Sequence, residues 1–178
     1  MRIVAGRWGG RRLTTPKGLA TRPTSDRVRE ALFSILGDRV QDARVLDLFA
    51  GSGALGLEAL SRGAAEATFV DSAGAAVAAV KANLEALGGE AEVRRNEALR
   101  FLRTATGETR HYDLVLLDPP YRLAERLGRE LSETLPAVLA PSALVISESD
   151  HRAPLPLDLP LTDERRYGDT LIRIHEPR

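Results

Sequence analysis

The chain has 178 residues, of which 43% are hydrophobic and 28% charged, an ordinary balance for a soluble globular domain with its own core. It contains no cysteine, which excludes disulfides and thiolate metal sites. The three histidines lie far apart in the sequence without ligand-like spacing, so we predict no metal site. No apolar run approaches the length of a membrane span, and we expect a cytoplasmic protein.

The formal net charge is zero, but the charges are unevenly distributed along the chain. Residues 1–36 hold eight basic residues against two acidic ones, a balance of +6, and the rest of the chain carries −6. A basic segment on a neutral chain is typical of a protein that binds a polyanion at one end. A solvated basic face explains the same pattern equally well, so the choice depends on the motifs that follow.

The first basic residues surround a candidate hairpin. Residues 2–6 and 11–14 can pair across Trp8-Gly9-Gly10. Arg7 and Arg11 would then suit phosphate contacts, while the indole offers a stacking face for a base. In the alternative, which the sequence leaves open, Trp8 is folded onto the surface of the domain.

A helix is expected after this hairpin. Thr24 or Ser25 can cap its N-terminus, and Gly37 ends it. Five apolar residues fall on one face of the helix: Val28, Ala31, Leu32, Ile35 and Leu36. Arg27 and Arg29 are then expected to point away from the core.

Residues 45–56 predict a strand, a glycine turn and the start of a helix. The run from Val45 to Phe49 is apolar except for Asp47, which suits a buried parallel strand. Glycines at 51, 53 and 56 follow in G-x-G-x-x-G spacing, and a helical pattern continues to Gly63. Glycines let the backbone pass close to a ligand, and a helix N-terminus offers free N–H groups. The pattern favours a nucleotide-like ligand over a turn that binds nothing.

Asp71 ends the apolar stretch 67–70 and lies twenty residues after Gly51. An acidic side chain at the end of a second strand can accept hydrogen bonds from both ribose hydroxyls of a nucleotide. NAD and S-adenosylmethionine share that ribose, so these residues are equally compatible with a dehydrogenase and a methyltransferase.

The tetrapeptide Asp118-Pro119-Pro120-Tyr121 distinguishes between the two. It follows the buried-strand run 113–117, where an α/β sheet carries its ligand chemistry. The prolines fix φ and lack N–H groups, and Pro119 forces Asp118 toward an extended conformation. One carboxylate, one fixed carbonyl and one aromatic face form a receptor for a flat base bearing an NH₂ group. A dehydrogenase has no need of such a receptor.

The remaining elements alternate between helices and strands. Helices are expected near 77–87, 98–102 and 123–139, the last kinked or ended by Pro136, and strands at 92–95, 143–146, near Arg166 and at 171–175. Glu148 follows one of these strands, where it either borders the site or is a surface carboxylate. Alternating strands and helices imply a parallel sheet, and two late strands without a helix between them imply an antiparallel edge.

The chain resembles a known family through these motifs. The glycine turn, Asp71 and Asp-Pro-Pro-Tyr resemble class I S-adenosylmethionine-dependent methyltransferases that modify an amino nitrogen of a base. Residues 22–33, 46–53 and 166–170 are similar to the bacterial RsmD family. The resemblance implies a Rossmann-like α/β fold, with a mostly parallel seven-stranded sheet, an antiparallel C-terminal edge strand, helices on both faces and a short N-terminal β-hairpin extension.

The resemblance also implies an activity. Members of the RsmD family transfer a methyl group from S-adenosylmethionine to N2 of one guanine in 16S ribosomal RNA, guanine 966 being the family target. The implied cofactor-binding residues are Asp47, Phe49, Ala50, Gly51, Gly53, Asp71, Glu97 and Asp118. Glu97 stands where related methyltransferases have an aspartate that receives the adenine amino group. The implied catalytic residues are Asp118, Pro119 and Tyr121, and the expected RNA contacts are Arg7, Arg11, Arg22, Arg27 and Tyr121.

We therefore expect residues 1–36 to form a basic RNA-binding extension and residues 37–178 to form the methyltransferase domain. The expected partner is 16S ribosomal RNA within a small-subunit particle, and the expected state is a monomer. Two other functions stay open, namely a DNA adenine-N6 or cytosine-N4 methyltransferase and an RNA-binding protein without catalytic activity.

Overall fold

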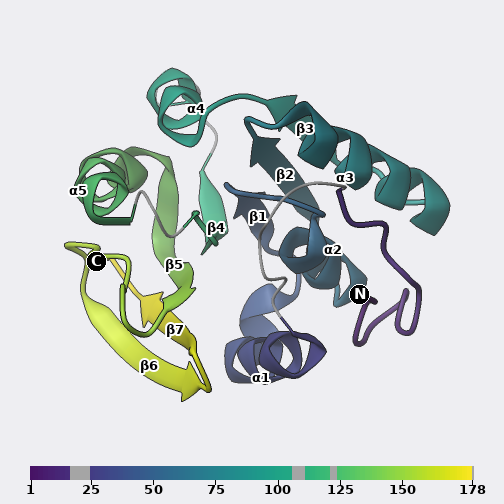
Figure 1. The fold of residues 1–178 in the computed structure, drawn as a ribbon, viewed down its shortest axis with the longest axis horizontal. Coiled ribbons are helices and arrows are strands. Elements are labelled where there is room, and N and C mark those ends of the chain that lie inside the picture. The colour runs from purple at the N-terminus through teal and green to yellow at the C-terminus, as the bar shows by residue number, and fades with distance from the viewer. Residues whose placement is uncertain (17–24, 106–110, 121–123, 178) are drawn as a thin grey trace.

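The computed structural model describes residues 1–16, 25–105, 111–120 and 124–177. Within these residues, seven strands form one sheet in the order β3-β2-β1-β4-β5-β7-β6 (Figure 1). The strands are β1 Arg44–Asp47, β2 Glu66–Asp71, β3 Glu92–Arg95, β4 Tyr112–Leu117, β5 Leu139–Asp150, β6 Leu161–Tyr167 and β7 Thr170–His175. The helices are α1 Asp26–Leu36, α2 Ala54–Ser61, α3 Gly74–Leu87, α4 Ala98–Ala105 and α5 Ala124–Thr134, with 3₁₀ turns η1 Gly37–Val40 and η3 Leu135–Val138.

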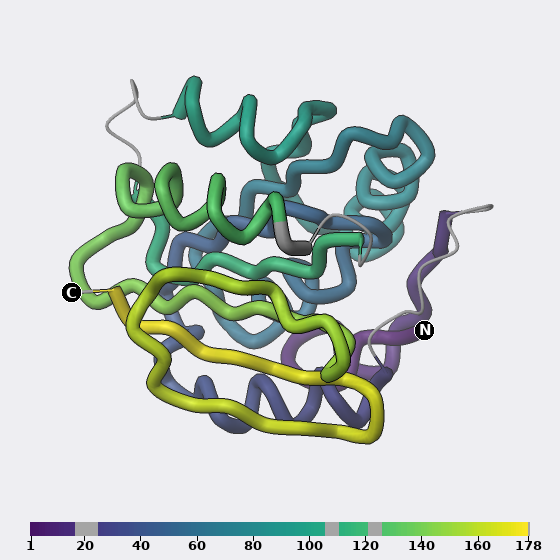
Figure 2. The backbone as a smooth tube through the Cα atoms, turned by 60° about the vertical axis from the view of Figure 1, so that its left-hand side comes forward, coloured from purple at the N-terminus to yellow at the C-terminus, as the bar shows by residue number. Residues whose placement is uncertain are grey.

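The sheet is mostly parallel, as the sequence predicts. Strands β1 to β5 all run in the same direction, and β7 pairs antiparallel with both β5 and β6. The antiparallel strand is therefore inserted one position in from the edge, and β6 is the edge strand. Figure 2 shows β6 and β7 as a hairpin that continues the sheet beyond β5.

Helices cover both faces of the sheet, so the core has two parts. On one face α1, α2 and α3 pack against the sheet, with buried residues that include Leu32, Leu57, Val80 and Leu84. On the other face α4, α5 and η3 supply Leu102, Leu131 and Leu135. Figure 1 shows this separation of α4 and α5 from the other three helices. The predicted Rossmann-like fold with helices on both faces is confirmed.

The predicted helix boundaries agree with the structure in several places. Ser25 caps α1, since its Oγ accepts a hydrogen bond from the N–H of Val28 at 3.3 Å. Gly37 ends the same helix. The structure also corrects one boundary, because Leu139 begins β5 and does not belong to the preceding helix, which ends at Thr134.

The N-terminal residues form the predicted hairpin, closed by one antiparallel bridge between Arg2 and Arg12. The indole of Trp8 is buried at 7% exposure, with the Arg7 guanidinium stacked 4.1 Å from its ring centroid. Of the two alternatives for Trp8, the structure shows the ring folded onto the domain. The expectation for Arg29 is wrong, because its side chain is fully buried and donates to the carbonyl of Arg2 and to Asp26.

We predict that Gly56→Ala destabilises the fold by roughly 1–3 kcal/mol, the usual effect of overpacking a core. A Cβ atom at Gly56 would lie 2.4 Å from the ring of Phe69 in β2. Gly74→Ala is the matched control, because its Cβ would make an ordinary contact at 3.5 Å with Arg95. Urea unfolding of both variants measures the difference, and equal stabilities would contradict the close packing of α2 on the sheet.

Candidate active site

The candidate site lies at the carboxyl ends of the central strands. Strand β1 pairs with β2 on one side and with β4 on the other. The strands that follow β1 are therefore added first on one side of it (β2, β3) and then on the other (β4, β5), which makes the gap between β1 and β4 a topological switch point. Ligands of open α/β sheets bind at such a switch point, beyond the carboxyl ends of the strands. The glycine turn follows β1 and the Asp118-Pro119 segment follows β4, so the fold brings these two motifs together.

Asp47 joins the glycine turn to the helix that follows it. Its carboxylate is buried at the end of β1 and accepts a hydrogen bond from the N–H of Gly56 at 3.0 Å. Gly53, the N-cap of α2, has φ 79° and no side chain with which to cap the helix. Asp47 therefore satisfies one of the N–H groups that the first turn of a helix leaves unpaired. Burial raises the pKa of Asp47 to about 7, and the negative charge of Asp71 adds to the rise.

Asp71 holds the other side of the turn. One of its carboxylate oxygens accepts the N–H of Gly51 at 2.9 Å, and the other accepts the N–H of Ala73 at 2.8 Å. The N–H of Ala50 donates to the carbonyl of Val70, which ties the turn to β2 a second time. Each carboxylate oxygen has a further lone pair, so Asp71 can still accept hydrogen bonds from ribose hydroxyls.

Asp118 is the acidic residue of the second motif. It continues the side-chain alternation of Leu114 and Leu116 in β4, which places it on the same face of the sheet as Asp47. Burial raises the pKa of Asp118 well above its usual value, and the negative charges of Glu148 and Asp47 raise it further. Asp118 is followed by Pro119, which is buried.

Glu148 borders this site and is not a surface carboxylate. It lies in β5 with 4% exposure and follows Ser147, the register partner of Leu117. Its neighbour Ile146 belongs to the same part of the core as Leu116, so alternation places Glu148 on the face that carries Asp118. The sequence left this residue with two alternatives, and its burial decides between them.

The residues at this edge fit S-adenosylmethionine. Gly51 and Gly53 have positive φ, and a Cβ at Gly51 would meet nothing within 4 Å, so the turn is open to a ligand at that point. An ammonium group beside Asp47 would stabilise the ionised form of this buried carboxyl group. Phe49 is partly buried between β1 and the turn, and Glu97 is exposed just after β3. The cofactor contacts expected from the sequence, those of Phe49, Ala50 and Glu97 among them, all stay predictions.

Three of the expected RNA-binding residues lie on the hairpin and on α1. Arg7 and Arg11 are exposed on the hairpin, where Arg11 donates to the carbonyl of Ala86 at the end of α3, and Arg27 is exposed on α1. Arg22 and Tyr121 lie outside the described residues. In the part of the chain that the structure describes, Arg7 and Arg27 form no ion pair with a carboxylate.

Three polar residues that fix the hairpin were not predicted. Glu58 accepts the N–H groups of Val4 and Ala5, and Ser61 accepts that of Trp8 through its hydroxyl. Asn83 in α3 bonds to the hairpin and to the glycine turn. A signal exists for Asn83, because it is spaced by three and four residues from Val80 and Leu87 on the buried stripe of α3.

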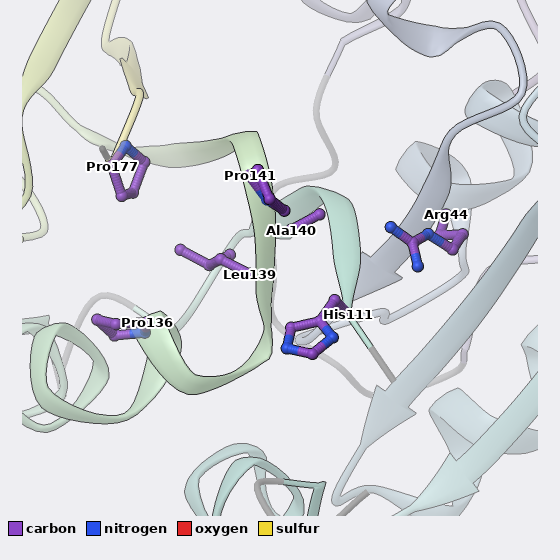
Figure 3. Close-up of a pocket in the computed structure, with 7 residues that line it drawn as sticks. All are labelled: Arg44, His111, Pro136, Leu139, Ala140, Pro141 and Pro177. Carbon is purple, nitrogen blue, oxygen red and sulfur yellow. The ribbon is translucent and has the colours of Figure 1, made fainter. Parts of the chain in front are cut away.

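A hollow at the opposite edge of the sheet does not belong to this site. It lies where β1, β4 and β5 begin and is lined by Arg44, His111, Leu139 and Pro141, among others (Figure 3). Arg44 in this hollow is paired with Asp113 at 2.9 Å. Across the described ranges, no group of three or more potential metal ligands is placed to hold a metal ion. None of the helices described here is long and apolar enough to cross a membrane.

Comparison with known proteins agrees with the fold and shows the family of the chain. The family model described as conserved hypothetical protein 95 matches residues 1–176. Ribosomal RNA small subunit methyltransferase D of Escherichia coli K12 is 43% identical over 182 residues, covering 99% of this chain and 89% of that protein. The protein of the same name from Haemophilus influenzae is 38% identical, covering 99% of this chain and 93% of its own length. The solved structure of a hypothetical protein from Thermus thermophilus is similar with a TM-score of 0.85 and 32% identity, covering 99% of both chains.

These matches extend over almost the whole of each chain, so they include the glycine turn, the Asp118 segment and the N-terminal hairpin together. The chain therefore belongs to the family described as conserved hypothetical protein 95, which is the RsmD family of methyltransferases.

Proposed function

We propose that this protein transfers the methyl group of S-adenosylmethionine to the exocyclic N2 of a guanine in small-subunit (16S) ribosomal RNA. The observation that carries the proposal is the position of Asp118 and Pro119, which follow β4 directly beside the glycine turn of β1. The family supports the same reaction, since two of its members are named small-subunit ribosomal RNA methyltransferases.

The chemistry requires an acceptor for the hydrogens of the nucleophile. When bound, S-adenosylmethionine supplies a methyl group made electrophilic by its sulfonium. Guanine N2 is a poor nucleophile because its lone pair is delocalised into the ring. Asp118 and the carbonyl of Pro119 can each accept a hydrogen bond from one of the two N–H groups of N2. These two hydrogen bonds favour a pyramidal nitrogen, whose lone pair is then free to attack the methyl group. The carboxylate also stabilises the positive charge that develops on the nitrogen. That charge would be lost when the methylated nitrogen gives up one proton to Asp118 or to water, while the cofactor would leave as the neutral thioether S-adenosylhomocysteine.

The remaining site residues orient the two substrates. We assign Asp71 to the ribose hydroxyls and Asp47 to the ammonium group of the cofactor, which the bond of Asp71 to the glycine turn and the burial of Asp47 support. The position of Tyr121 two residues after Pro119 in the sequence suits stacking on a guanine that has left its own stack. Holding the nucleophile in line with the methyl group accounts for most of what the protein must supply.

Residues 1–36 supply the proposed RNA contacts. Arg7, Arg12 and Arg27 are exposed, and among the described residues none of them has a carboxylate partner. Their charges are therefore available for phosphates, which dominate the affinity of proteins for nucleic acids. Arg11 and Arg22 are assigned to the same surface from the sequence. We propose that residues 1–36 form the RNA-binding extension and residues 37–178 the catalytic domain.

The finer identity of the substrate belongs to the same proposal. We assign guanine 966 as the target, within an assembled small-subunit particle, and a monomer as the active form. A ribosomal substrate requires the protein to share the compartment of the ribosome, which is the cytoplasm in bacteria.

The test is transfer of a labelled methyl group from S-adenosylmethionine to small-subunit particles that lack the modification, followed by nucleoside analysis. The expected product is N2-methylguanosine at one position. Label recovered only in DNA, as N6-methyladenine or N4-methylcytosine, would overturn the proposal. Cofactor binding without transfer to particles or to free 16S RNA would also overturn it and would leave an RNA-binding protein.

Asp118→Ala is predicted to lower kcat by about 10²- to 10³-fold, the usual effect of removing one group that stabilises transition-state charge. The Kd for S-adenosylmethionine should stay within about twofold, since Asp47 and Asp71 hold the cofactor side of the site. Asp71→Ala is the matched variant and should weaken cofactor binding instead. Calorimetry and single-turnover transfer separate the two effects, and an equal loss of cofactor affinity in Asp118→Ala would show that Asp118 is not an acceptor for the base.

Glu148→Gln is predicted to shift the pH dependence of kcat/KM. Asp118 must be ionised to stabilise the positive charge that develops on N2, so activity falls as the pH drops through its raised pKa. Removing the negative charge of Glu148 lowers the pKa of Asp118, and the acid limb of the profile should move to lower pH. The exposed Glu133→Gln in α5 is the control and should leave the limb in place. If the acid limb of the Glu148→Gln profile did not move, the charge of Glu148 would not be what raises the pKa of Asp118.

A further inference from the structure

Asn83 connects two parts of the protein that have different proposed ligands. It lies in α3 with 2% exposure. Its Oδ1 accepts the N–H of Thr14 at 2.7 Å, and its Nδ2 donates to the carbonyl of Thr14 and to the carbonyl of Ser52, both at 2.9 Å. Thr14 ends the N-terminal hairpin, and Ser52 lies between the two glycines of the turn. One amide group therefore holds both segments.

These three bonds use the amide almost completely. Asn offers one acceptor oxygen and two N–H donors, and in this site both donors and the oxygen are engaged. Because the group is buried, a lost bond is not replaced by one to bulk water, so a shift of Thr14 is felt at Ser52. The partners of the amide in all three hydrogen bonds are backbone atoms of Thr14 and Ser52. The bonds therefore depend on where the two backbone segments lie and not on their side chains.

The hairpin has a second anchorage that does not involve the turn. Glu58 and Ser61 in α2 bind the backbone of residues 4–8, at 2.7 to 3.0 Å for the three N–H groups of Val4, Ala5 and Trp8. The hairpin would therefore stay docked without Asn83. What Asn83 adds is a direct connection from the end of the hairpin to the glycine turn, through the carbonyl of Ser52.

We infer that Asn83 is a positioning residue that couples RNA binding at the hairpin to cofactor binding at the glycine turn, so that each ligand tightens the binding of the other. The inference rests on the proposed function, because it takes the hairpin with Arg7 and Arg12 as an RNA contact. RNA that orders the hairpin fixes Thr14, and through Asn83 it fixes the carbonyl of Ser52 and the turn. Thermodynamic linkage requires that RNA raises the affinity for the cofactor by the same factor by which the cofactor raises the affinity for RNA.

The test measures that factor with S-adenosylhomocysteine, which binds without reacting. Its Kd is determined with the full chain, alone and with saturating unmodified 16S ribosomal RNA. In the wild type the RNA should lower this Kd at least about fivefold, within the usual range of coupling between sites. In Asn83→Asp, where a carboxylate oxygen faces the two carbonyls, and in Asn83→Leu, the ratio of the two Kd values should fall to about one.

Ser61→Ala is the matched control, because it weakens the hairpin without touching the turn and should keep the wild-type ratio. A merely structural role for Asn83 would lower stability in the variants while the ratio stayed as in the wild type. Steady-state kinetics gives a second readout: the KM for each substrate should rise in Asn83→Asp, with kcat at saturation within about twofold of the wild type.

Either of two results would overturn the inference. One is a wild type whose Kd for S-adenosylhomocysteine does not respond to RNA, and the other is an Asn83→Asp or Asn83→Leu variant that keeps the wild-type ratio. Both results leave methyl transfer to the RNA intact. Failure of the proposed function is seen separately, as a wild type that transfers no methyl group to 16S RNA or to small-subunit particles.

Discussion

The rest of the site depends on the hydrogen bond between the buried carboxylate of Asp47 and the N–H of Gly56. The acceptor ends β1 and the donor lies in the first turn of α2, so the bond fixes the helix N-terminus at the carboxyl end of that strand. Close packing of Gly56 on Phe69 holds the same helix from the side. The turn between strand and helix is therefore held at both of its ends.

The hairpin is tied into this arrangement by ordinary internal contacts. Its Ile3, Trp8 and Leu13 belong to the same part of the core as the helices α1 to α3, and Figure 1 shows it lying along that side of the molecule. The predicted boundary after residue 36 divides a basic segment from an acidic remainder. The hydrophobic core, in contrast, extends across this boundary. The proposed RNA surface and the proposed cofactor site therefore share one hydrophobic core.

The sequence predicts the parts of the site that lie within one short segment. The glycine turn and Asp118-Pro119 each follow a recognisable strand, and parallel strands bring their carboxyl ends to one edge, so their proximity is predictable. The burial of Arg29 and Trp8 and the role of Asn83 depend on contacts between distant segments, which periodicity does not contain. The start of β5 at Leu139 is not predictable from the sequence, because Pro141 is unusual inside a strand and so is the positive φ of 62° at Ser142.

The strand order also has a consequence for the way the chain folds. The β1–β4 pair brings Val45 beside Leu114, which closes a loop of about 70 residues, whereas β1, β2 and β3 pair with near neighbours in the sequence. Contacts that close long loops form late, because the entropy of closure opposes them until other contacts have formed. The glycine turn and Asp71 belong to the half of the chain that leaves the ribosome first, and Asp118 to the half that follows. In a nascent chain the glycine turn and Asp71 therefore emerge before Asp118, the residue proposed as the acceptor for the base.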